Sequence, residues 1–195
     1  MCHSQRTEPW LYCRLFEGGA LNIDWLLIGL RVLHIGGAVF WAGSAFFFFG
    51  FIEPTTVALG PESQKFMHHM VDKRKIAERI VAASTLTVAA GALLYWRDSS
   101  GFDLSWITRP TGVVFTLGAL AGFAAWVNGV FGIHGTVHRL DDLGTAMATA
   151  GRPPSGEELG RMGALAGRLH VLGIADVILL GFALLAMATA RYISF

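Results

Sequence analysis

The sequence predicts an all-α integral membrane protein, built as a bundle of four transmembrane helices. Its 195 residues are 53% hydrophobic and only 15% charged, and the mean hydropathy of +0.52 is too high for an ordinary soluble domain of this size. A helix needs about 20 apolar residues to cross the hydrocarbon core of a bilayer. Four stretches meet this requirement, at residues 25–52, 77–96, 111–133 and 165–190.

The chain before the first stretch predicts a flexible leader over residues 1–22, followed by a single four-helix domain over residues 23–195. The leader has no apolar core and no small-residue cleavage site, so we do not expect a cleaved signal peptide. Cys2 and Cys13 are the only cysteines of the chain. They could form a disulfide in an oxidising compartment, but free thiols are the simpler interpretation.

The connections between the stretches carry their own local signals. Pro54 follows Glu53 and is expected to end the first helix, because proline lacks a backbone donor. Residues 62–78 are typical of an amphipathic surface helix that runs straight into the second membrane helix. Before the fourth stretch, Ser155 with Glu158 three residues later predicts a capped helix start.

The basic residues predict the orientation, because cytoplasmic loops carry an excess of Lys and Arg. The connections after the first and third helices hold Lys65, Lys73, Arg74, Lys75, Arg79, Arg139, Arg152, Arg161 and Arg168. The other side holds only Arg6, Arg14, Arg97, Arg109 and Arg191. Amphipathic aromatic residues, which favour the headgroup level, gather on that second side at Trp25, Tyr95, Trp96, Trp106 and Tyr192. We therefore expect both termini on the outer, periplasmic side of a bacterial inner membrane.

One face of the first helix is the strongest candidate for a cofactor site. Helical spacing places on this face Arg31, His34, Ala38, Trp41 and Ala45. A membrane helix rarely carries an imidazole without a use for it. Gly37 and Ala38 leave room for a flat macrocycle, and Arg31 could meet a propionate, so the pattern fits haem b ligated by His34. In the alternative interpretation, His34 only bonds another helix, for example through Asp176, and holds the bundle together.

The other polar residues within the stretches have structural interpretations as well. His170 falls at a different depth from His34, which leaves a second axial haem ligand unassigned. Arg31 and Asp176 are expected at similar depths and predict an intramembrane ion pair, with a proton-carrying carboxylate as the alternative. Asn128 is interpreted as a hydrogen-bonding contact between helices.

A second candidate site could form from the histidines on the inner side. His134 and His138 are four residues apart, so a continuing helix would place both rings on one face, as a shared metal requires. His170 begins the neighbouring helix, and His68 and His69 lie in the first inner connection. These five residues could bind copper or zinc. The HxxxH pair lacks the glutamate of the hydrolytic zinc motif, and solvated interfacial histidines are the alternative.

Several functional classes find no support in the chain. It has no glycine loop for phosphate, no nucleophile elbow and no CxxC pair, and its net charge of +1 gives no indication of nucleic acid binding. Small residues such as Gly118 and Gly122 predict close helix packing. This packing could be internal or against other membrane subunits, including copies of the same chain.

The first helix also resembles a known group of proteins. Leu30-Arg31-Val32-Leu33-His34, followed by Trp41-Ala42-Gly43, is similar to the opening helix of small bacterial four-helix membrane proteins. The group includes the copper-resistance D (CopD) proteins, the HemJ-type protoporphyrinogen oxidases and the membrane part of the PuuD-type urate oxidases. The resemblance implies that His34 carries haem binding or redox work. HemJ-type enzymes also need a lysine in a later membrane helix, and the absence of lysine from the later stretches argues against that activity.

Together these observations predict an inner-membrane protein that binds b-type haem through His34 and takes part in electron transfer as a subunit of a larger membrane complex. One alternative is a non-catalytic accessory subunit, in which the histidine and the ion pair only fix the packing. Another alternative is a membrane protein that handles copper or other metal ions. The sequence predicts no specific reaction.

Overall fold

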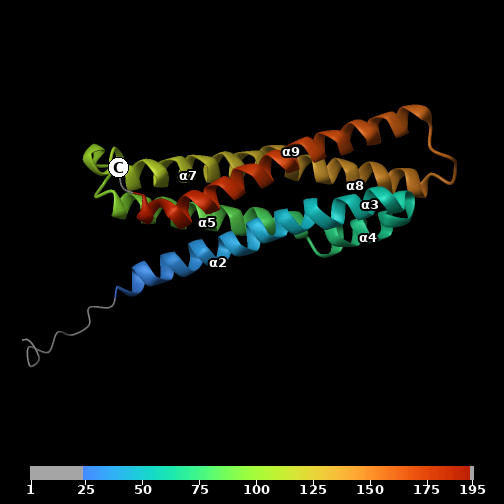
Figure 1. The fold of residues 1–195 in the computed structure, drawn as a ribbon. Helices are drawn as coiled ribbons and strands as arrows, with labels where there is room; N and C mark the ends of the chain where they lie inside the picture. Colours follow the sequence, from blue (N-terminus) through green and yellow to red (C-terminus); the bar gives the residue numbers. More distant parts are fainter. Residues whose placement is uncertain (1–23, 194–195) are drawn as a thin grey trace, which may run out of the picture.

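The computed structural model describes residues 24–193, and these are almost entirely helical and contain no strand. Four helical runs are long and apolar enough to cross a membrane: Trp25–Lys73, Ile76–Asp98, Pro110–Thr149 and Gly156–Tyr192. They lie side by side along one axis (Figure 1). The prediction of an all-α protein with four helices long and apolar enough to span a membrane is therefore confirmed. The predicted leader, with Cys2 and Cys13, lies outside the described residues.

The first run continues past the proline at which we expected it to end. Asp24 caps α2 (Trp25–Phe47) by accepting a hydrogen bond from the Leu27 amide at 2.9 Å. A π-helix, η1 (Phe48–Ile52), leads directly into α3 (Glu53–Leu59). Pro54 lies in the first turn of α3, where a missing amide donor is tolerated, and the wider π turn supplies the change of register. The predicted helix end at Pro54 is therefore wrong.

After α3 the chain turns back on itself. Gly60 has φ 55° at the start of the 3-10 helix η2 (Gly60–Ser63), a conformation that suits glycine. The chain then forms α4 (Gln64–His68) and a second π-helix, η3 (His69–Lys73). Lys75 is left-handed, with φ 51°, and α5 (Ile76–Asp98) begins only after it. The predicted surface helix therefore does not run straight into the second membrane helix, because a left-handed residue ends a right-handed helix.

The third and fourth runs extend beyond the apolar stretches. A short α6 (Leu104–Ile107) precedes the third run, which consists of α7 (Pro110–Val127), the π-helix η4 (Asn128–Ile133) and α8 (His134–Thr149). The fourth run consists of α9 (Gly156–Thr189) and η5 (Ala190–Tyr192). The Ser155 and Glu158 side chains form the predicted capping box at the start of α9. Hydropathy located only the apolar parts of these runs, because α8 and the first turns of α9 are polar.

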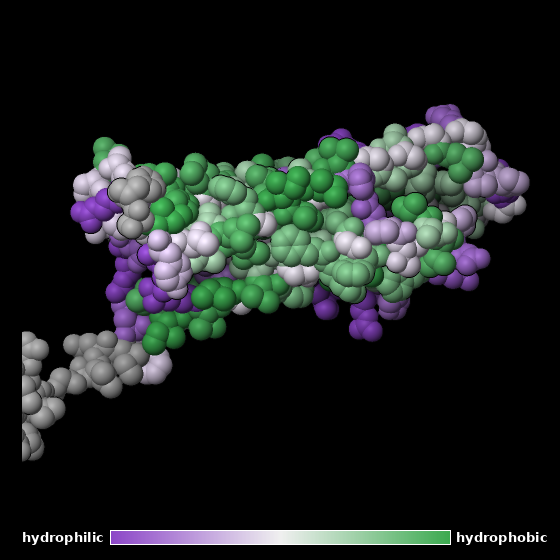
Figure 2. Space-filling model, in the orientation of Figure 1, coloured by the Kyte–Doolittle hydropathy of each residue, from purple (hydrophilic) through white to green (hydrophobic). Residues whose placement is uncertain are grey.

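The bundle consists of two closely packed helix pairs, α2 with α5 and α7 with α9. A small buried core joins the pairs at Trp41, Ala42, Ala45, Ala125 and Leu180. Apolar side chains cover the middle of the molecular surface, and polar residues gather toward the two ends (Figure 2). This distribution is what a lipid bilayer around the middle of the bundle requires.

The two ends of the bundle differ in content. At the end that we call the termini end, Arg97 of α5 contacts Asp24, and Thr111 donates a hydrogen bond to the Ile193 carbonyl at 3.4 Å. The opposite end contains α3, α4, η3, the start of α5, α8 and the first half of α9 (Figure 1). We call it the histidine end, because His68, His69, His134, His138 and His170 belong to its segments.

Candidate functional site

Histidine and carboxylate side chains form three pairs at the histidine end, and each pair joins segments that are far apart in the chain. The pairs are His68 with Asp141 at 3.1 Å, His138 with Glu78 at 3.3 Å, and His170 with Glu53 at 3.1 Å. The helices of this end are therefore connected through imidazole and carboxylate groups.

One of these pairs belongs to a cluster that could hold a metal ion. Glu78, His134 and His138 each offer one ligand atom, and the three atoms lie within 4.8 Å of one another. The two histidines occupy successive turns of α8, and their ring centroids are 4.7 Å apart in an edge-to-face arrangement. The prediction that both rings lie on one face of a continuing helix is therefore confirmed.

Glu78 has an acceptor that the protein leaves unsatisfied. Its Oε1 lies 3.3 Å from Nε2 of His138, while Oε2 is buried and has no hydrogen-bond partner among the described residues. A buried oxygen without a donor costs free energy, and a bound cation would satisfy it. Glu78 also lies in the first turn of α5, where the positive end of the helix favours a carboxylate.

The other predicted metal ligands are placed elsewhere. His170 bonds Glu53 through Nδ1, and Nδ1 of His68 lies near Asp141 and, at 3.4 Å, the Thr145 hydroxyl. His69 lies in η3 and belongs neither to one of the three histidine–carboxylate pairs nor to the metal cluster. The predicted set of five histidines therefore separates into different surroundings, and only His134 and His138 come together.

The carboxylate of the cluster was not predicted. Glu78 comes from a different membrane helix than the histidines, so no local spacing connects it with them. The available signal was weak: Glu78 is one of two acidic residues, with Asp72, that flank the basic run Lys73-Arg74-Lys75, and it lies at the start of an apolar stretch.

His34 lies between α2 and α5. Its Nδ1 is 2.8 Å from the backbone carbonyl of Thr87, and its ring rests on Gly91, where an added Cβ would lie 2.7 Å from Cε1. A carbonyl can only accept, so Nδ1 carries a proton and donates this bond. The ring therefore joins two helices, as in the alternative interpretation of this residue, but through Thr87 instead of Asp176.

The other residues of the predicted haem face occupy separate surroundings. A Cβ on Gly37 would collide with Oγ1 of Thr87, so α5 fills the space that we had assigned to a macrocycle. Ala38 is half-buried, and Trp41 is only 4% exposed within the bundle core. Arg31 lies on the outer surface of α2, where it lines a shallow groove with Ile28, Val32, Ile35 and Gly36.

The predicted ion pair between Arg31 and Asp176 is not formed. Asp176 is 2% exposed, and its Oδ1 accepts a hydrogen bond from Nδ2 of Asn128 at 3.2 Å. Asp176 thus faces the third helical run, whereas Arg31 is exposed on the outer surface of the first. The sequence indicated similar depths, but depth alone does not fix the direction in which a helix turns its side chains. Asn128 does join two helices, as predicted.

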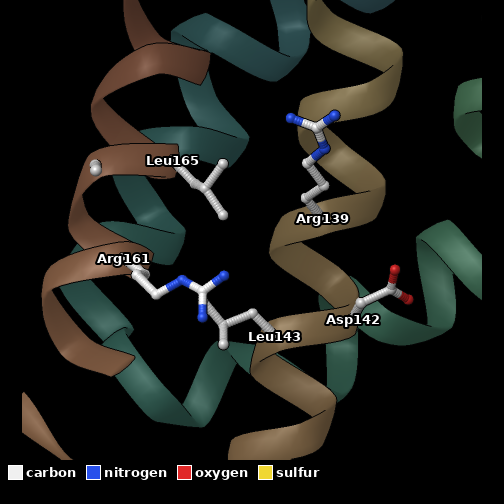
Figure 3. Close-up of a pocket in the computed structure, with 6 residues that line it drawn as sticks. Arg139, Asp142, Leu143, Arg161 and Leu165 are labelled. Atoms are coloured by element: carbon white, nitrogen blue, oxygen red, sulfur yellow. The ribbon is translucent and has the colours of Figure 1, made fainter. Parts of the chain in front are cut away.

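An open cleft between α8 and α9 adds positive charge to the histidine end. Arg139 and Leu143 line it from α8, and Arg161, Ala164 and Leu165 line it from α9. Asp142 of α8 also lines the cleft. Figure 3 shows the Arg161 and Leu143 side chains directed into the space between the helices and the Asp142 side chain turned away from α9. The cleft contains no histidine and is separate from the metal cluster.

Comparisons with protein-family models, with curated proteins and with solved structures find no match to this chain. Any assignment of function therefore starts from the side chains themselves.

Proposed function

We propose that the protein is a multi-pass membrane protein that binds a divalent transition-metal ion through Glu78, His134 and His138. The observation that carries the proposal is the convergence of three ligand atoms within 4.8 Å, together with the unsatisfied Oε2 of Glu78. Two imidazoles and one carboxylate suit zinc, copper, iron or nickel better than calcium or magnesium, which prefer oxygen ligands alone.

The surroundings favour an exchangeable ion over a permanently enclosed one. Three protein ligands leave at least one coordination position open. The His138 side chain is 35% exposed and the Glu78 side chain 41%, so an ion can enter and leave from one side of the bundle. The site is therefore suited to capturing or delivering metal ions at the membrane surface.

We infer that the histidine end faces the cytoplasm of a bacterial cell, which places the termini end in the periplasm. The nine basic residues that predict the orientation all belong to segments at the histidine end, including both arginines of the cleft in Figure 3. Positive charge of this kind marks the cytoplasmic side of a multi-pass protein. The metal site would then take ions from, or deliver them to, the cytoplasm.

Metal titration of the purified, detergent-solubilised full chain tests the function. Isothermal titration with zinc is expected to give one site, and Glu78→Gln or His134→Ala should weaken it at least about tenfold, the usual scale for losing a ligand or its support. His170→Ala is the matched control, because it removes an imidazole–carboxylate pair outside the cluster. Cobalt(II) absorption should show coordination in the wild type that Glu78→Gln perturbs. Unchanged affinity in a Glu78→Gln, His134→Ala double variant would refute the proposal.

Haem b at His34, with a role in electron transfer inside a larger membrane assembly, is a second candidate. The hydrogen bond from Nδ1 to the Thr87 carbonyl supports it, because iron-ligating histidines use this device to direct Nε2 at the metal. Gly37 offers no slot for the macrocycle between α2 and α5, which favours the metal site over haem. A Soret band that is lost in His34→Ala would favour haem. A colourless, metal-free preparation that binds neither group would favour an accessory subunit.

A further inference from the structure

Asp176 is a carboxyl group inside a membrane-spanning helix that the proposed metal site does not use. It belongs to α9 and is 2% exposed. Among residues 24–193, no Lys, Arg or His nitrogen lies within 4.0 Å of it, and Asn128 provides its hydrogen bond. The chain thus buries a titratable group in its apolar region without an opposite charge.

The elements packed around this part of α9 supply no neutralising partner. η1, α7 and η4 contain no titratable side chain at all. The first helix carries Arg31, which is exposed on its outer surface, and His34, which bonds Thr87. In α8, His134 and His138 lie beside Glu78 instead. On α9 itself, the histidine nearest to Asp176 is His170, which bonds Glu53.

The packing around Asp176 is specific. The Phe49 ring occupies the place where Gly173 lacks a side chain, so that a Cβ there would collide with it. Leu172 packs closely against Gly132, where an added Cβ would lie 3.1 Å from its Cδ1. Phe49 and Gly132 belong to π-helices η1 and η4, and single π turns inside α-helices occur frequently at functional sites. Two such segments therefore meet α9 within one turn of the buried carboxyl.

The hydrogen bonding of Asn128 supports both protonation states of the carboxyl. Its Nδ2 donates to the Leu172 carbonyl at 2.8 Å and to Oδ1 of Asp176 at 3.2 Å. An unpaired carboxylate in a medium of low dielectric is costly, and one amide donor offsets only part of that cost. The same donor also bonds the carbonyl oxygen of a neutral carboxyl, although more weakly than it bonds a carboxylate. The geometry thus holds Asp176 in place while a proton binds and leaves.

We infer that Asp176 is a reversible proton-binding site inside the membrane, with Asn128 as its positioning residue. Intramembrane carboxyl groups of this kind serve in proton relays and in proton-coupled transport. The inference does not rest on the proposed metal site, which lies on other residues and near the end of the bundle.

Labelling with dicyclohexylcarbodiimide, a hydrophobic reagent that modifies protonated carboxyl groups, tests the inference. The full chain is reconstituted in lipid vesicles, treated at a series of pH values and mapped by mass spectrometry. We expect Asp176 to be modified several-fold faster at acidic than at alkaline pH. Asp176→Asn should abolish modification of this peptide, Asp176→Glu should retain it, and Asp142→Asn should leave it unchanged.

Asn128→Ala tests the positioning role. Loss of the amide donor disfavours the ionised form, so labelling of Asp176 should extend to more alkaline pH. Infrared spectroscopy gives a second readout, since a protonated-carboxyl band should be present in the wild type, absent in Asp176→Asn and reduced as the pH rises. No labelling of the folded wild type, or labelling and an infrared band that do not change with pH, would overturn the inference.

Discussion

Two adjacent glycines of α2 have opposite surroundings. Gly37 faces α5, where an added Cβ would collide with Oγ1 of Thr87 and lie 3.3 Å from the Ala83 carbonyl oxygen. A Cβ added on Gly36 would meet nothing within 4 Å. Gly37→Ala should therefore separate α2 from α5 and lower stability by about 1–3 kcal/mol, the usual cost of overpacking. Gly36→Ala is the matched control and should cause no loss in a thermal unfolding assay; equal effects of both would contradict the packing.

Gly173 offers a test of the contact between the first and fourth runs. Gly173→Ala would place a methyl group in the Phe49 ring and should destabilise the protein by a similar amount, about 1–3 kcal/mol. Phe49→Leu in the same chain should recover part of the loss, because the smaller side chain makes room. A double-mutant cycle measured by thermal unfolding checks this coupling. Additive effects of the two substitutions would show that the residues do not touch.

At single residues, the sequence identified which side chains were unusual but not what they would touch. His34 and Asp176 stood out because polar groups in apolar helices need partners. The HxxxH pair stood out because its spacing allows two imidazoles to share a metal. Their partners are Thr87, Asn128 and Glu78 in that order. Each partner belongs to another helix than the residue it contacts and is far from it in the chain. Such pairings depend on how each helix is rotated in the bundle, and a single sequence does not specify this rotation.

The start of α9 is an element whose stability should depend on pH. Hydrogen bonds from Arg152 and from the Ser155 backbone lower the pKa of Glu158 from 4.5 to about 2. A carboxyl with a lowered pKa stabilises the fold above its ordinary pKa, and this contribution is lost as the pH falls through the lowered value. The first turn of α9 should therefore fray between about pH 4.5 and pH 2.

Hydrogen exchange of the peptide that covers the first turns of α9 measures this effect. In Glu158→Gln, the exchange should already be faster at neutral pH and should depend less on acidification. Glu157→Gln, one residue earlier and outside the capping box, should behave like the wild type. An acid response that persists in full in Glu158→Gln would assign it to another group.

The element boundaries show what local patterns specify. The capping box at Ser155 was predictable because its two hydrogen bonds join residues three apart. The continuation through Pro54 was not, because it depends on the π turn η1 that precedes the proline. Likewise, the sequence did not predict how far α8 extends beyond the apolar stretch 111–133, since hydropathy reports lipid contact and not helix length.

For the whole molecule, the orientation in the membrane is open to a direct test. In a chain with Cys2 and Cys13 replaced by serine, a cysteine at Ser105 reports on the termini end and a cysteine at Ala150 on the histidine end. A membrane-impermeant maleimide applied to spheroplasts should label Ser105→Cys from outside. Ala150→Cys should react only after permeabilisation. The reverse pattern would place the metal cluster on the periplasmic side.

The fold class was predictable from composition because a bilayer imposes length and apolarity on every span. The arrangement of the spans was not predictable in the same way. Small residues indicated close packing, and the structure shows which helices use them: Gly37 and Gly91 between α2 and α5, and Gly118 between α7 and α9. At other glycines, such as Gly163 and Gly167, an added Cβ would meet no atom of another element within 4 Å.

The pairing of α2 with α5 and of α7 with α9 has a consequence for biosynthesis. Each span packs most extensively against the one translated immediately before or after it. As the ribosome releases the second span, its partner is already in the membrane, and the third and fourth spans repeat the event. Local contacts of this kind favour rapid folding. A single inserted hairpin of the first two spans, and then two hairpins not yet packed together, are therefore natural intermediates in the assembly of this protein.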